Sequence, residues 1–193
     1  MQVHGLFEVR WHARGGQGAV TASRFLSAAA IRENKHFQGF PEFGTERMGA
    51  PIQAFTRVSD SRIYVHSQVT TPDAVVVLDP TLLSVVNVAA GLSSGGVLIV
   101  NSPKPAAELR KDMQLPAGIK LFTVDATKIA LECVGRPVTN TAMVGALVKV
   151  TNLIAFDNVR EELKAMFGGK FKASVVEGNV KALERAYEDV AGE

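Results

Sequence analysis

Two short stretches of this sequence, DAVVVLD (73–79) and GGVLIVN (95–101), are apolar at almost every position. A strand that is apolar on both faces has to be covered on both faces, which is typical of the central strands of a parallel sheet. Parallel strands also need a crossover connection between them, and this connection is usually a helix. The two stretches therefore favour an α/β fold, with helices on both faces of a mainly parallel sheet.

The order of the other segments agrees with this fold. Residues 6–12 alternate apolar and polar side chains, which predicts a first strand, and residues 119–126 predict another. Helical patterns occupy the intervals at about 81–89 and at 106–113. The repetition predicts a single Rossmann-like, doubly wound domain over residues 1–193.

Less regular patterns fill the rest of the chain. Residues 36–51 hold two prolines, three glycines and three phenylalanines, which predicts an irregular loop after a short strand. The alternating runs 52–58 and 62–69 are separated by turn-forming residues and are predicted to form a hairpin or adjacent edge strands. After residue 126 the pattern is helical, with GGKFKASVV (168–176) as the only stretch typical of a flexible linker.

Charge and cysteine content argue against several classes of protein. The 21 Lys and Arg residues nearly balance the 19 Asp and Glu residues and are scattered, so we expect no nucleic-acid partner. Cys133 is the only cysteine, which rules out an intramolecular disulfide and disfavours a metal or cluster site in this chain. No run approaches the roughly 20 apolar residues of a membrane helix, and no signal peptide is recognisable, so we expect a cytoplasmic protein without a membrane contact.

The strongest local signal is Arg14-Gly15-Gly16-Gln17-Gly18-Ala19, between the first strand and a helix. Glycines there allow close approach of a ligand, and the free amides of a helix N-terminus attract phosphate. The alternative is a tight turn that simply needs glycine. The spacing matches neither the G-x-G-x-x-G fingerprint nor a P-loop, which weakens the case for NAD or ATP.

Two further positions have a functional and a structural interpretation. Arg47 stands between two glycines in the irregular loop, where it can bind phosphate or form a surface ion pair with Glu46. Asn140 precedes an apolar helical segment, where it can contact a ligand or serve as an ordinary N-cap. The four histidines have no visible partner at catalytic or metal-binding spacing, and no catalytic residue is indicated.

Several of these segments together resemble one protein family. The segments are RGGQGAVTAS, FPEFGTERMGAPIQAFTR, DAVVVLDPTLL, GGVLIVN and VTNTAMVGAL, in this order. They resemble the gamma subunit, or gamma domain, of pyruvate and related 2-oxoacid:ferredoxin oxidoreductases over nearly the whole chain.

The resemblance implies a role in a larger enzyme. Such an enzyme decarboxylates a 2-oxoacid on thiamine diphosphate with Mg²⁺, passes electrons through [4Fe-4S] clusters to ferredoxin or a similar acceptor, and releases an acyl-CoA. This chain has one cysteine and no Gly-Asp-Gly segment, so thiamine diphosphate, Mg²⁺ and the clusters are expected on alpha, beta and delta-type partner subunits.

The resemblance also implies that this chain contributes to the coenzyme A (CoA) site. The implied CoA-binding residues are Gly15, Gly16, Gln17, Gly18, Ala19, Arg47, Asn140 and Asn179. The expected 2-oxoacid is pyruvate, with phenylglyoxylate, indolepyruvate or 2-oxoglutarate as alternatives. Alternatives from other classes are a free-standing nucleotide-binding module and a purely structural subunit.

Overall fold

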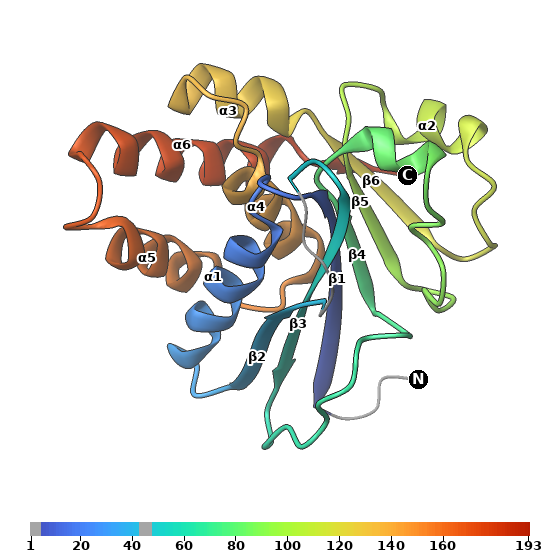
Figure 1. The fold of residues 1–193 in the computed structure, drawn as a ribbon, viewed down its shortest axis with the longest axis horizontal. Coiled ribbons are helices and arrows are strands. Elements are labelled where there is room, and N and C mark those ends of the chain that lie inside the picture. Colours follow the sequence, from blue (N-terminus) through green and yellow to red (C-terminus); the bar gives the residue numbers. More distant parts are fainter. Residues whose placement is uncertain (1–4, 43–47) are drawn as a thin grey trace.

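The structure, a computed structural model, describes residues 5–42 and 48–193 of the chain (Figure 1). The strands are β1 (Leu6–Arg14), β2 (His36–Pro41), β3 (Pro51–Ser59), β4 (Ala74–Val77), β5 (Val97–Asn101), β6 (Lys120–Val124) and β7 (Ala191–Gly192). The helices are α1 (Ala19–Ile31), α2 (Ala106–Asp112), α3 (Ala126–Val134), α4 (Asn140–Thr151), α5 (Phe156–Phe167) and α6 (Ala173–Asp189), with a 3₁₀ helix, η1 (Pro80–Ser84). No helix within these described ranges has both the length and the hydropathy needed to cross a membrane.

All the strands belong to one sheet, in the order β2-β3-β1-β4-β5-β6-β7. The central strands β1, β4, β5 and β6 are parallel to one another. The outer strands are antiparallel to their neighbours: β3 to β1, β2 to β3 and β7 to β6. The predicted α/β fold with a mainly parallel core is confirmed, and the antiparallel edges are an addition to it.

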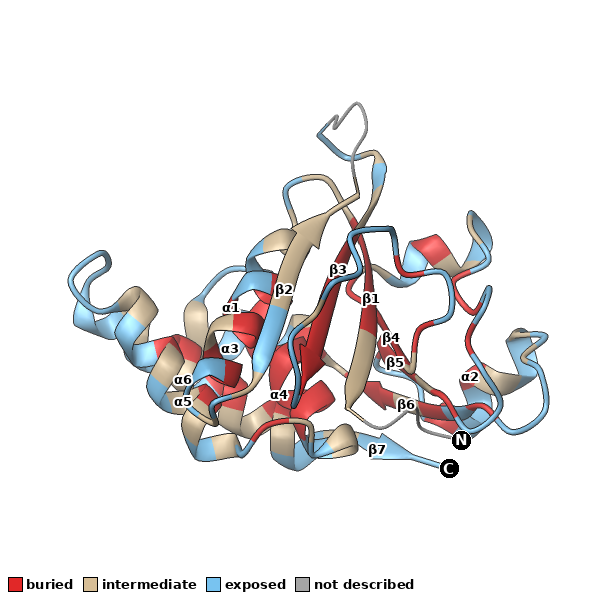
Figure 2. Ribbon diagram, turned by 90° about the horizontal axis from the view of Figure 1, so that it is seen from below, coloured by how far each residue is buried: buried red, intermediate tan, exposed pale blue. Residues whose placement is uncertain are grey.

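Helices cover both faces of the parallel strands, which explains why these strands are apolar throughout. Ala74 and Val76 of β4 face a core formed with α1, α3, α4, α5 and α6. Val75 and Val77 face the smaller core formed with η1 and α2. Figure 2 shows the buried residues concentrated in the central strands and in the helix surfaces that cover them.

A buried polar contact fixes α1 against the sheet. The indole nitrogen of Trp11 in β1 donates to the hydroxyl of Thr56 in β3 at 3.0 Å. That hydroxyl in turn donates to the backbone carbonyl of Ser23 in α1 at 3.3 Å. Because Trp11 is fully buried, this chain of bonds sets the position of α1, and with it the loop that joins β1 to α1.

Four sequence predictions about local structure were wrong. Residues 36–41 form strand β2 rather than part of an irregular loop. Its Gly39 is needed for close packing and not for a turn, because a Cβ there would lie 2.6 Å from the hydroxyl oxygen of Ser27 in α1. Residues 168–172 are irregular, but α6 begins at Ala173, inside the predicted linker.

Residues 62–69 form no strand, because both edges of β3 are already paired, with β1 and with β2. The guanidinium of Arg57 donates instead to the backbone carbonyls of Val65 and Ser67. The predicted helix at about 81–89 is a short 3₁₀ helix followed by turns, and Arg10 donates to the carbonyls of Val88 and Ala90.

Candidate functional site

The loop between β1 and α1 has a backbone conformation that requires glycine. Gly16 and Gly18 have φ angles of 95° and 83°, in the left-handed region that L-residues with a side chain avoid. Gly18 is the N-cap of α1 and provides no side-chain cap. Among the described residues, no acceptor forms a hydrogen bond with the backbone amides of Gly16, Gly18 or Ala19. The loop therefore satisfies the tight-turn interpretation and also leaves amides free for an anion.

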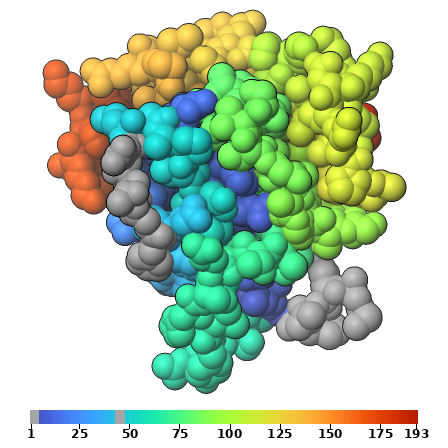
Figure 3. Space-filling view, turned by 45° about the vertical axis from the view of Figure 1, so that its right-hand side comes forward, coloured from blue at the N-terminus to red at the C-terminus, as the bar shows by residue number. Residues whose placement is uncertain are grey.

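The loop lies where ligands commonly bind in an open α/β sheet. Strand β1 has β3 on one side and β4 on the other, so the chain connections diverge next to its carboxyl end. The crevice outside such a point is the usual ligand site of doubly wound sheets. Figure 3 shows this face, on which blue residues from the amino-terminal part of the chain lie between the cyan and green segments.

A second segment, residues 48–50, packs directly on the glycine loop. The amide of Gly15 donates to the carbonyl of Ala50 at 2.9 Å, and the amide of Gly49 donates to the carbonyl of Gly15 at 3.1 Å. A Cβ on Gly16 would lie 2.8 Å from the sulfur of Met48. Arg47, the candidate phosphate ligand that precedes Met48, lies outside the described residues.

Asn140 joins the same place from α4. A Cβ on Gly18 would lie 2.7 Å from Asn140 Nδ2, so the carboxamide rests against the glycine loop. The oxygen Oδ1 of Asn140 accepts from the amide of Thr141 at 2.9 Å. Asn140 is the first residue of α4, and Thr139 is the N-cap of that helix. The interpretation of Asn140 as the N-cap was therefore wrong by one residue. Its side chain nevertheless satisfies one free amide of the helix end.

The electrostatics of the two helix ends favour an anion. Neither α1 nor α4 has an acidic residue in its first turn, and the N-termini of both helices meet at Gly18 and Asn140. The partial positive charges of the two helix ends therefore act on the same region.

The hydrogen bonds of the Asn179 side chain go to α4 and α6 and not to the glycine loop. Asn179 is 5% exposed, and its Oδ1 accepts from the hydroxyl of Thr141 at 3.0 Å. Its Nδ2 donates to the carbonyl of Val175 at 2.8 Å. Asn179 thus ties α6 to the first turn of α4, one residue away from Asn140.

Three partners of the glycine loop, Arg14, Asp79 and Thr81, were not predicted from the sequence. Arg14, the last residue of β1, lies 3.3 Å from the carboxylate of Asp79, which follows β4. The side-chain amide of Gln17 donates to Asp79 at 2.7 Å, and the same carboxylate caps η1 by accepting from the backbone amide of Thr81 at 2.9 Å. Burial alone would raise the pKa of Asp79, but the hydrogen bonds from Thr81 and Gln17, with the charge of Arg14, hold it below its ordinary value.

The buried histidine of β1 offers no acid–base group to this site. His12 is 4% exposed and accepts from Nε of Arg10 at 3.1 Å. Burial, reinforced by the charge of Arg10, lowers the pKa of His12 to about 4, so the ring is neutral near pH 7. Over the described parts of the chain, no three His, Cys, Asp or Glu residues are grouped as metal ligands.

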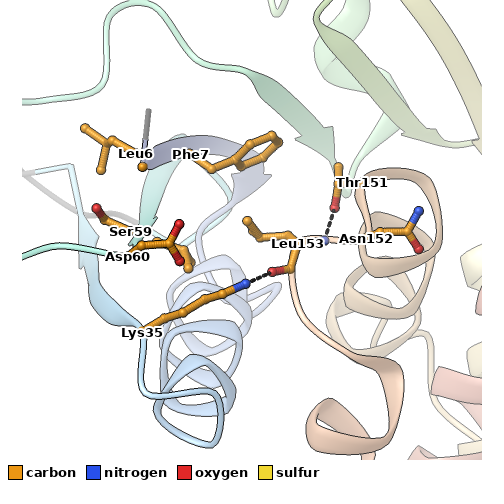
Figure 4. A pocket seen from close by; sticks show the side chains of 10 residues that line it. Leu6, Phe7, Lys35, Ser59, Asp60, Thr151, Asn152 and Leu153 are labelled. Carbon is orange, nitrogen blue, oxygen red and sulfur yellow. Dashed lines mark hydrogen bonds between the residues drawn. The ribbon is translucent and has the colours of Figure 1, made fainter. Parts of the chain in front are cut away.

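A separate hollow of about 590 Å³ lies at the opposite end of β1 (Figure 4). It is lined by the start of β1 at Leu6 and Phe7, together with Lys35 and Leu153. The amine of Lys35 is already bound, to the carbonyl of Leu153 at 2.8 Å and to the carboxylate of Glu33 at 3.0 Å. Among the described residues that line it, this hollow therefore presents no free cation for a phosphate ligand.

Comparisons with known proteins agree on one family. The family model described as "Pyruvate ferredoxin/flavodoxin oxidoreductase" matches residues 8–189. The chain is 49% identical to the "Pyruvate/ketoisovalerate oxidoreductases common subunit gamma" of Thermococcus kodakarensis, over 94% of this chain and 96% of that protein.

Two solved structures have the same fold. The crystal structure of pyruvate oxidoreductase subunit PORC from Thermotoga maritima matches with a TM-score of 0.85 and 41% identity, over 98% of this chain and 99% of that one. A 2-oxoglutarate:ferredoxin oxidoreductase from Magnetococcus marinus, with 2-oxoglutarate, coenzyme A and succinyl-CoA bound, matches with a TM-score of 0.78. That match has 21% identity over 95% of this chain and 31% of the other, so it concerns the fold alone.

Proposed function

Because the chain belongs to the pyruvate ferredoxin/flavodoxin oxidoreductase family, we propose that it is the gamma-type subunit of a 2-oxoacid:ferredoxin oxidoreductase. The complete enzyme oxidatively decarboxylates a 2-oxoacid to an acyl-CoA, CO₂ and a reduced acceptor. The names of the relatives favour pyruvate as the 2-oxoacid. Activity assays of the assembled enzyme with pyruvate, branched-chain 2-oxoacids, aromatic 2-oxoacids and 2-oxoglutarate would identify the substrate.

In this enzyme the chain binds part of CoA, at the glycine loop. The observation that carries this proposal is the meeting of two helix N-termini at Gly18 and Asn140, next to amides that have no acceptor among the described residues. CoA carries a diphosphate and a further phosphate, and helix N-termini of this kind bind phosphate groups. Arg47, two residues before Gly49, supplies a fixed positive charge in the same proposal.

Electron transfer and decarboxylation are assigned to other subunits. Cys133 is the only cysteine, whereas a [4Fe-4S] cluster requires four thiolate ligands, so the clusters do not fit this chain. The sequence also has no Gly-Asp-Gly segment of the kind that helps to hold thiamine diphosphate and Mg²⁺. We therefore assign thiamine diphosphate, Mg²⁺ and the clusters to alpha, beta and delta-type partners. The proposed cellular location is the cytoplasm, where ferredoxin or a similar acceptor is reduced.

The test is the KM for CoA in the assembled enzyme. Arg47→Ala removes a charge-assisted contact and is expected to raise this KM about tenfold to hundredfold. Gly16→Val places a β-branched side chain at a φ of 95° and against Met48, and is expected to raise it at least as much. The KM for the 2-oxoacid should not change in either variant.

A matched control separates the site from general strain. Gly95 has a φ of 85°, and a Cβ there would meet no atom within 4 Å, so Gly95→Val imposes similar backbone strain away from the loop. It should leave the KM for CoA unchanged. If neither Arg47→Ala nor Gly16→Val alters CoA dependence, the loop is a structural turn and CoA binds elsewhere.

A further inference from the structure

A network of side chains ties the glycine loop to two segments that are distant in the sequence. The guanidinium of Arg14 lies 3.3 Å from the carboxylate of Asp79 and donates from Nη2 to the hydroxyl of Thr81 at 2.9 Å. Its Nη1 donates to the carbonyl of Gly49 at 3.1 Å. One side chain therefore joins the end of β1 to residues 48–50 and to the start of η1.

The carboxylate of Asp79 is saturated by this network. Its Oδ1 accepts from the amide and the hydroxyl of Thr81, at 2.9 and 2.6 Å. Its Oδ2 accepts from the carboxamide of Gln17 at 2.7 Å and faces the guanidinium of Arg14. The oxygen Oε1 of Gln17 accepts from the backbone amide of Arg14 at 2.7 Å. Both ends of the Gln17 carboxamide are thus fixed, and Gln17 lies in the middle of the glycine loop.

These bonds divide the amides of the loop into two groups. The amides of Arg14, Gly15 and Gln17 hold the loop in shape, through bonds to Gln17, Ala50 and Arg14 respectively. The amides of Gly16 and Gly18 have no acceptor in the part of the chain that the structure describes. The bonds of the first group therefore help to hold the backbone conformation of the loop, and the amides of the second group are available to a ligand.

We propose that Arg14 and Asp79 are positioning residues, which hold the glycine loop and residues 48–50 in the geometry that binds the phosphates of CoA. Neither residue contacts the phosphates. This inference rests on the proposed function of the loop. It differs from the simplest interpretation of Arg14, in which the guanidinium binds phosphate directly and Asp79 is only its counter-ion.

The two interpretations predict opposite effects of Asp79→Asn. If Asp79 acts only through its charge, removing that charge next to an anion site should lower the KM for CoA. If Asp79 positions the loop, the asparagine cannot accept from both Gln17 and Thr81 as the carboxylate does, so the orientation of Gln17 is lost. The KM for CoA should then rise, by about threefold to thirtyfold.

The experiment uses the assembled enzyme and measures the KM for CoA, the KM for the 2-oxoacid and kcat. Asp79→Asn and Arg14→Met are each expected to raise only the KM for CoA. Asp112→Asn, in an exposed ion pair with Lys104, and Arg32→Met, in an exposed pair with Glu162 beyond the last turn of α1, are the charge-matched controls. Neither control should change any of the three constants.

The double variant tests whether the two residues act together. Asp79→Asn combined with Arg14→Met should raise the KM for CoA no more than the stronger single variant, because either one breaks the same network. Full addition of the two effects would instead assign Arg14 a direct phosphate contact. Thr81→Val provides a milder probe, since it removes the exposed hydroxyl that joins Arg14 to Asp79, and it should raise the KM in the same direction.

The outcomes separate this inference from the proposed function. A lower or unchanged KM for CoA in Asp79→Asn and Thr81→Val overturns the positioning role. If Gly16→Val and Arg47→Ala still raise the KM, the CoA site itself stands. If none of the four variants changes CoA dependence, both proposals fail.

Discussion

The close approach of Asn140 to Gly18 allows packing to be measured separately from backbone strain. Gly18 has a φ of 83°, and a Cβ there would lie 2.7 Å from Asn140 Nδ2 and 3.1 Å from Asn140 Cγ. Gly135, at the end of α3, has a φ of 77°, and a Cβ there would meet no atom within 4 Å. Alanine at either position imposes the same kind of strain, but only alanine at position 18 collides with a side chain.

The expected costs follow from these contacts. Alanine in the left-handed conformation costs about 1–2 kcal/mol at either position. At Gly18 the new methyl group must also displace the Asn140 carboxamide, whose bond to the amide of Thr141 contributes about 1 kcal/mol more. We therefore expect Gly18→Ala to lower the free energy of unfolding by about 2–3 kcal/mol, and Gly135→Ala by about 1–2 kcal/mol. For a chain of 193 residues the difference is roughly 2–4 °C in Tm.

The assay is urea unfolding of the full chain at pH 7, with both single variants measured together. The double variant Gly18→Ala/Asn140→Ala removes the collision, so it should lose less stability than the sum of its two single variants. If Gly18→Ala costs no more than Gly135→Ala, Asn140 does not rest against the loop. The result would then contradict the close approach of the N-termini of α1 and α4.

Two further predictions concern buried titratable side chains, His12 of β1 and Arg57 of β3. The pKa of His12 is lowered to about 4, so the unfolded chain binds this proton more tightly, and stability should fall as the pH drops from about 6.5 towards 4. The loss between pH 7 and pH 5 should be about 2 kcal/mol, and His12→Gln should reduce it in urea titrations at the two pH values. Arg57→Met breaks the ion pair with Glu8 and frees the carbonyls of Val65 and Ser67, which should cost about 2–4 kcal/mol and speed amide exchange over residues 62–68. Arg185→Met, in an exposed pair with Glu132, should cost much less stability than Arg57→Met, and an equal loss in the two variants would contradict the structural role of Arg57.

The parts of the fold that sequence could predict are those whose pattern is set by burial on both faces. Residues 74–77 and 97–100 are apolar because helices cover them on each side, and the uninterrupted apolar run alone indicates this. The run 62–69 has an equally good strand pattern, but β3 has no free edge for it. Pairing depends on which strands are neighbours, and local alternation does not contain that information.

Some residues of the candidate site could likewise be predicted from local sequence, and others could not. The glycine loop was recognisable because positive φ angles select glycine, and Asn140 because helix N-termini select short polar side chains. The link from Arg14 to Asp79 depends on β1 and β4 lying side by side, across 65 positions of sequence. The sequence did contain one indication that Asp79 belongs to the site. An aspartate at the end of a strand that is buried on both faces lies at the carboxyl edge of the sheet, where ligands commonly bind.

The chemical groups around the loop bear on how this chain takes part in catalysis. Asp79 accepts from Thr81 and Gln17 and forms an ion pair with Arg14, so its carboxylate is poorly placed to act as a base. His12 is neutral, buried and already bonded to Arg10. The described residues of the loop therefore offer amides, a carboxamide and a bound guanidinium, which can orient a ligand but cannot move a proton. Under the proposed function, the subunit affects the reaction by where it holds CoA, so substitutions in the loop should change the KM for CoA and leave 2-oxoacid decarboxylation intact.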